Sequence, residues 1–317
     1  MSIFELVSGG VGSARRARDR AFGRRLPHPR SGFLYLLALA VAALVVAVPG
    51  YLVLRAAGAG METVEALLSP RTWGTLGNTL LLAGAVVLST AAIAVPLAWL
   101  TTATDLPWRR VWAVLVALPL VVPSYVAAYL YVSLLSPRGV VQGWLEPLGV
   151  DRLPPIYGFA GAWLVLTLIA YPYTYLTVRA TLQRLDPSLL EAAPSLDLSP
   201  RAASWRITVP TLRPSLAAGS LLVALYCLRD FGAVNLLQYG TFTRVIYNRY
   251  QAYRLDEAAA MALLLVGLAA VLLYLDYRSR GRARYARLSP GCARGRPPAR
   301  PGLWTSPALS FFVAIVF

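Results

Sequence analysis

The chain has 317 residues, of which 57% are hydrophobic and only 14% are charged. Soluble domains carry about 25% charged residues. The composition therefore excludes a protein that is surrounded by water alone. The formal net charge is +16, and all 30 basic residues are arginines. Because these arginines lie beside apolar runs, they indicate membrane topology and argue against nucleic-acid binding.

Apolar runs long enough to cross a bilayer predict transmembrane helices along the chain. Residues 33–54 and 72–104, for example, contain no Asp, Glu, Lys or Arg, and a spanning helix needs about 20 apolar residues. The fifth run is interrupted by Arg229 and Asp230. We predict an all-α polytopic bundle with six spans, at about 33–55, 76–101, 111–135, 157–178, 215–238 and 258–276.

Three further segments flank this six-span domain, which we place at 33–276. Residues 1–32 form a basic N-terminal tail, and residues 277–302 form a basic linker. A last apolar run, 303–317, reaches only about 22 Å at ~1.5 Å per residue, which is short of a ~30 Å hydrocarbon core. We interpret it as an incomplete seventh span of a longer chain, with a re-entrant or interfacial tail as the alternative.

Arginine counts predict the orientation. With a cytoplasmic N-terminus, the inside segments carry seven arginines in 1–32, two at 109–110, five in 179–213 and eight in 277–302, against seven in the outside loops. The excess of arginine in cytoplasmic loops therefore favours this orientation. It places the 179–213 loop in the cytoplasm.

Residues that carry catalytic or metal chemistry are scarce. Cys227 and Cys292 are far apart, and His28, the only histidine, lies in the basic tail. We therefore predict no catalytic constellation, no metal site and no cofactor. Without a lysine the chain lacks a phosphate-binding Gly-rich loop, so ATP hydrolysis is expected on a separate subunit.

The cytoplasmic loop shows structure of its own. Asp186-Pro187 and Ser199-Pro200 are both helix-start signals, and the second segment ends at Pro210. Two short helices joined by a turn would form a compact knob. The alternative is an amphipathic hairpin lying on the lipid interface.

The segment EAAPSLDLSPRAASWRITVPTLRPSL, residues 191–216, resembles the EAA loop of permeases in binding-protein-dependent ABC importers. The family pattern begins with Glu-Ala-Ala, continues to a Gly and ends with Ile/Val-x-x-Pro. The positions that carry the resemblance are Glu191, Ala192, Ala193, Asp197 in place of the Gly, Ile207 and Pro210. The resemblance implies that a coupling loop, residues 181–213, docks on a cytoplasmic ATP-binding subunit and transmits nucleotide-driven closure.

Two residues depart from the family pattern. A non-Gly residue in a left-handed turn costs ~1–2 kcal/mol, and Asp is among the least penalised, so Asp197 can keep the turn. Pro194 removes a backbone hydrogen bond and would kink the first short helix. Both changes bear on coupling efficiency rather than on the fold.

The resemblance extends beyond the loop. Residues 78–110, 118–135 and 228–250 are similar to the first half of iron(III)-type permeases, in which two six-span halves are fused. This implies the type I ABC importer permease fold, iron(III) import across the bacterial inner membrane, a periplasmic substrate-binding protein and a second permease half. Thiamine permeases, or those for another small solute, remain an alternative.

Arg229 and Asp230 are the charged residues that interrupt the interior of a predicted span. Such residues are often functional, which makes them candidates for the translocation path or a gate. The alternative is that both reach the interface or a neighbouring helix. We also expect six tyrosines near span ends to belong to interfacial aromatic belts, namely Tyr125, Tyr129, Tyr131, Tyr171, Tyr173 and Tyr175. A tyrosine-lined path for a metal complex is the alternative. Gly84, Gly161 and Gly219 are expected to permit close helix contacts.

Three other functional classes remain open. An ion-coupled secondary transporter usually carries several intramembrane carboxylates, and this chain offers only Asp230 with Arg229. An intramembrane enzyme would need a His/Asp/Glu or Ser/Lys constellation within the spans, and the predicted spans contain none. A truncated, non-transporting permease is the third alternative.

Overall fold

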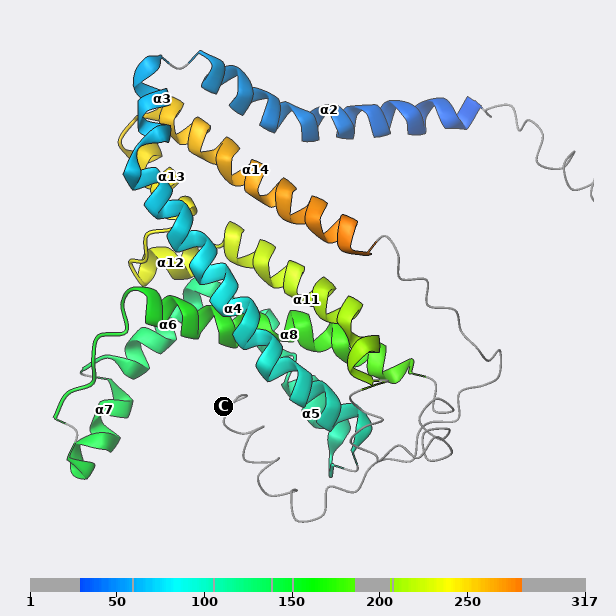
Figure 1. The fold of residues 1–317 in the computed structure, drawn as a ribbon, viewed down its shortest axis with the longest axis vertical. Coiled ribbons are helices and arrows are strands. Elements are labelled where there is room, and N and C mark those ends of the chain that lie inside the picture. The colour runs from blue at the N-terminus through cyan, green and yellow to red at the C-terminus, as the bar shows by residue number, and fades with distance from the viewer. Residues whose placement is uncertain are drawn as a thin grey trace, which may run out of the picture. The chain divides into compact units, whose positions relative to one another are not determined.

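The computed structural model describes residues 29–58, 60–104, 106–137, 139–149, 151–185, 206 and 208–280. The chain divides into two units, Met1–Leu54 and Arg55–Phe317, and each element in the described part is a helix (Figure 1). In chain order these are α2 (Pro29–Ala57), α3 (Met61–Leu68), α4 (Pro70–Ala103), α5 (Arg109–Leu115), η1 (Leu118–Val121), α6 (Ser124–Leu135), α7 (Val140–Leu145), η2 (Glu146–Leu148), α8 (Phe159–Gln183), α11 (Val209–Arg229), α12 (Gly232–Leu236), α13 (Phe242–Gln251) and α14 (Leu255–Arg280).

Five described helices are long and apolar enough to cross a membrane, namely α2, α4, α8, α11 and α14. A sixth span results if Arg109–Val121 and Ser124–Leu148, which are bent by 99°, are counted together. The predicted all-α polytopic bundle is confirmed, with five or six spans in the described part of the chain. The predicted seventh span, 303–317, lies outside the described residues.

The predicted third span, 111–135, is broken rather than continuous. Pro119 lies in η1, and Pro123 stands directly before α6. Proline lacks a backbone N–H and disfavours the α conformation in the residue before it. Val122 accordingly has extended backbone angles, φ −82° and ψ 120°, so the helix stops and restarts in a new direction.

The predicted fifth span, 215–238, also ends earlier than expected. α11 stops at Arg229, and the backbone of Asp230 is extended with φ −67° and ψ 126°. The chain then re-enters the bundle as the short helix α12. The run is apolar on both sides of the break, which is why hydropathy alone joined the two parts.

The helices of the second unit pack around two apolar clusters. α4 and α8 lie side by side, and α11 contacts both of them (Figure 1). One cluster joins α4, α6, α8, α11 and α12, with the fully buried side chains Leu82, Val86, Val165, Leu166 and Leu237. The other cluster lies toward the C-terminal ends of α4 and α8. It includes Leu97, Val116, Tyr171, Tyr175, Val178 and Leu212.

The expectation of an interfacial belt is wrong for two of the six tyrosines, Tyr171 and Tyr175. Both side chains are fully buried in the second cluster. The Tyr175 hydroxyl donates to Thr101 Oγ1 of α4 at 3.1 Å, because a buried phenol needs a polar partner. Tyr175 therefore joins α8 to α4, whereas the buried Tyr171 hydroxyl has no hydrogen-bond partner in the described part of the chain.

The three predicted contact glycines differ. A Cβ atom on Gly219 would lie 2.7 Å from Thr174 Cα, so α11 and α8 approach closely there. A Cβ on Gly161 would meet the carbonyl of Ile156, just upstream in the chain, and one on Gly84 would find open space within 4 Å. The expectation of a close helix contact is confirmed for Gly219 alone.

Candidate functional site

The two helix breaks meet at one point in the bundle. Gly232, the first residue of α12, faces Ser124 and Tyr125 at the start of α6. A Cβ on Gly232 would lie 2.9 Å from the Tyr125 Cβ and 3.0 Å from the Ser124 Oγ. We call this contact the break junction, and it requires a residue without a side chain at position 232.

Asp230 holds the break junction together through its carboxylate and its backbone. The side chain is 6% exposed, and Oδ2 accepts a hydrogen bond of 3.0 Å from the Ala233 amide of α12. The carboxylate is also hydrogen-bonded to the side chain of Ser124. In addition, the Asp230 carbonyl accepts a 2.7 Å bond from the Thr243 hydroxyl of α13. One residue thus caps α12 and links it to α6 and α13.

Arg229 takes a different position from its neighbour. Its side chain is exposed, and its guanidinium lies over the Tyr226 ring, 5.4 Å from the ring centroid. No ion pair joins Arg229 to Asp230 in the described part of the chain. Asp230 therefore contacts α12, whereas Arg229 contacts the Tyr226 ring. That either residue lines a translocation path stays a prediction.

Broken helices have a specific meaning in a membrane. Non-helical backbone at membrane depth is tolerated only where protein buries it or where it lines a water-filled cavity, and transporters often place such breaks at their working sites. Here the break is buried, because Ala233, Val234 and Leu237 are 0% exposed. The sequence drew attention to Asp230 but not to Ser124 or Gly232, since their contact joins residues far apart in the chain.

The predicted coupling loop falls mostly outside the described residues. Glu191, Ala192, Ala193, Asp197 and Ile207 all lie there. Pro210 is described and occupies the first turn of α11, where its missing N–H has no helical partner to lose. The loop's flanks are packed together, because Leu212 of α11 joins Tyr175 and Val178 of α8 in one buried cluster.

The fold defines a multi-pass helical membrane protein. Residues 94–278, from within α4 to within α14, match the family model described as "Binding-protein-dependent transport system inner membrane component". This match covers more than half of the chain. The chain therefore belongs to that family of ABC permeases.

Relatives support the same assignment. The chain is 30% identical over 246 residues to the Fe(3+)-transport system permease protein FbpB 2 of Haemophilus influenzae, covering 77% of this chain but 45% of that protein. It therefore spans about half the length of this relative. It is 31% identical to the inner membrane ABC transporter permease protein YdcU of Escherichia coli, covering 69% of this chain and 75% of that protein.

Among solved structures, a bacterial ABC transporter involved in the import of alginate has a similar fold. The TM-score is 0.64 at 22% identity, and the match covers 80% of this chain and 97% of that one.

Proposed function

We propose that this chain is the transmembrane permease subunit of a binding-protein-dependent ABC importer and that its substrate is iron(III). The family match over residues 94–278 carries the proposal. The iron assignment is supported by the relative named as an Fe(3+)-transport permease, which aligns with 77% of this chain. The chain forms the translocation path, and a separate subunit hydrolyses ATP.

The proposed topology places the coupling loop, residues 181–213, in the cytoplasm. The arginine distribution favours a cytoplasmic N-terminus. α8 then runs inward and α11 runs outward, so the loop between them faces the ATP-binding subunit. A periplasmic substrate-binding protein would dock on the opposite side of the inner membrane. A second permease half would complete the pore.

Relatives with other substrates define the alternatives for the substrate. The chain is 28% identical to the sulfate transport system permease protein CysW of Synechocystis and 27% identical to the spermidine/putrescine permease PotB of Salmonella typhimurium. Cells that carry the complete transporter should accumulate radioactive iron(III) and lose this uptake when the gene for this chain is deleted. Loss of sulfate or polyamine uptake instead would replace the proposed substrate but keep the permease assignment.

The coupling role is tested by reversing one charge in the loop. We expect Glu191→Arg to leave the protein in the membrane but to abolish co-purification of the ATP-binding subunit, because an arginine would disrupt the docked surface. The matched control is Glu146→Arg, the same charge reversal at an exposed residue of η2. Undiminished co-purification with Glu191→Arg would contradict the docking role.

A further inference from the structure

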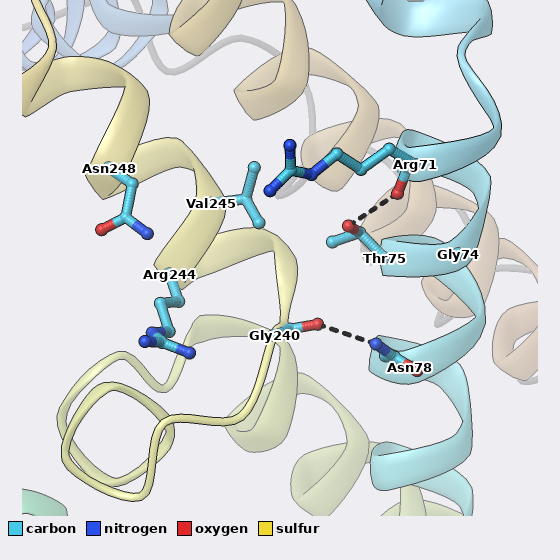
Figure 2. A pocket seen from close by; sticks show the side chains of 8 residues that line it. All are labelled: Arg71, Gly74, Thr75, Asn78, Gly240, Arg244, Val245 and Asn248. Carbon is cyan, nitrogen blue, oxygen red and sulfur yellow. Dashed lines mark hydrogen bonds between the residues drawn. The ribbon is translucent and has the colours of Figure 1, made fainter. Parts of the chain in front are cut away.

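A polar pocket lies in the second unit and is lined by residues other than those of the break junction. It has a volume of about 510 Å³ and lies between the first turns of α4 and the helix α13 (Figure 2). Its lining consists of Arg71, Gly74, Thr75, Asn78, Gly240, Arg244, Val245 and Asn248. Pockets of roughly 300–1,000 Å³ are typical of small-molecule sites, so this one has room for a ligand of several atoms.

The pocket lies at the end of the bundle opposite the coupling loop. Its α4 residues belong to the first three turns of that helix, whereas the loop follows the last residue of α8, and α4 and α8 run in the same direction. The contact between Asn78 Nδ2 and the carbonyl of Gly240, 3.3 Å long, fixes the two walls at one edge (Figure 2).

The lining carries two positive charges and no carboxylate. Two acidic residues that contact α13 are engaged elsewhere. Glu257 is ion-paired with Arg249 at 2.7 Å and with Arg254 at 2.8 Å, and the Asp230 carboxylate accepts a hydrogen bond from the Ala233 amide of α12. Arg71 and Arg244 form no ion pair within the described part of the chain. The pocket therefore keeps an uncompensated positive charge.

The two arginines also have unused hydrogen-bonding capacity. The Nε atom of Arg244 is buried and has no hydrogen-bond partner within the described part of the chain, and leaving such a donor unsatisfied is unfavourable. Arg71 is exposed and extends from α4 across to Val245 of α13 (Figure 2). The planar guanidinium group binds carboxylate and phosphate oxygens through paired N–H bonds.

We propose that this pocket is an oxyanion-binding site in which Arg71 and Arg244 supply the charge and Asn78 and Asn248 supply amide donors. The ligand class is an oxyanion of the phosphate or sulfate type. It arrives either as a free anion or as the phosphate of an anionic lipid headgroup, because both present the same oxygens. The site is separate from the coupling loop and from the break junction, so it does not depend on the iron(III) assignment.

The test measures phosphate binding by the purified full chain in phosphatidylcholine nanodiscs, using calorimetric titration with inorganic phosphate. We expect saturable binding that Arg71→Gln weakens at least tenfold, and Arg244→Gln likewise. The control is Arg110→Gln, which removes the same charge from an exposed residue of α5 and should bind phosphate as the unaltered protein does. Because Arg71 is exposed and forms no ion pair in the described part of the chain, Arg71→Gln decides the test if Arg244→Gln misfolds.

A second arm separates the two sources of the oxyanion. Nanodiscs containing phosphatidylglycerol should compete with free phosphate if the headgroup occupies the pocket, and the same arginine variants should then retain less phosphatidylglycerol through purification. Phosphate binding without such competition supports the free anion. Phosphate binding that is equal in all variants, or an absence of both phosphate binding and variant-dependent lipid retention, would overturn the proposal.

Discussion

Gly219→Ala is expected to destabilise the folded bundle by roughly 1–3 kcal/mol, because adding a methyl group to a close-packed contact forces its surroundings apart. The new Cβ would lie 2.6 Å from Thr177 Oγ1 and 2.7 Å from Thr174 Cα. A side chain can rotate away, but the Thr174 Cα belongs to the backbone of α8 and cannot. We therefore expect α11 and α8 to separate and the thermal unfolding midpoint in detergent to fall.

The same substitution at Gly84 is the matched control. Gly84 lies within α4, and a Cβ there meets nothing within 4 Å. Since alanine favours a helix interior over glycine by roughly 0.5–1 kcal/mol, Gly84→Ala should leave the unfolding midpoint unchanged or raise it. Equal midpoints for the two variants would show that the contact between α8 and α11 is looser than the structure indicates.

This packing also bears on the coupling loop. Gly219 of α11 contacts the residues of α8 that precede the loop, and Leu212 packs against Tyr175 and Val178 at the same end. Under the coupling role proposed for the loop, its movement would move α8 and α11 together. A variant that loosens this contact would then weaken coupling as well as stability.

The sequence was sufficient to predict most of the membrane-spanning helices. α4 and α14 appear in the sequence as long uncharged or nearly uncharged runs. The observed bounds of α14 lie within a few residues of the predicted ones, and α4 starts six residues earlier than predicted. Burial of a hydrogen-bonded helix in lipid depends mainly on length and apolarity. Both properties can be read directly from the residues.

Continuity within a span was harder to predict than its presence. Pro172 lies inside α8 without ending it, whereas the pair Pro119 and Pro123 breaks its span. A single missing N–H is tolerated when neighbouring groups satisfy the freed carbonyl. Two prolines four residues apart remove donors on the same face. Their spacing was therefore the feature of the sequence from which the break could have been predicted.

The candidate site could be predicted only in part. Asp230 was visible as an ionisable residue in an apolar run, but its partners Ser124 and Thr243 come from other helices. Which residues meet across a bundle depends on tertiary packing, for which a single sequence carries no pattern. The coupling loop shows the opposite relation between sequence and structure. Its motif in the sequence resembles a known family, but its residues 186–205 lie outside the described structure.

Asp230→Ala is expected to lower the thermal unfolding midpoint and to abolish uptake. Loss of a helix-capping side chain costs about 0.5–2 kcal/mol, and this substitution also leaves Ser124 without its carboxylate partner. Because α12 is buried between other helices, its displacement would disturb the break junction. The measurements are the unfolding midpoint of the purified chain and substrate uptake by cells.

Asp230→Asn separates the capping role from a charge-dependent gate. Asparagine caps a helix about as well as aspartate, and its amide oxygen can accept the bond from the Ala233 amide that Oδ2 now accepts. The contacts in the structure favour the capping role, so we expect Asp230→Asn to keep both the midpoint and uptake. If uptake is lost while the midpoint is unchanged, the negative charge itself is needed, and the gate predicted from the sequence would replace the cap as the function of Asp230.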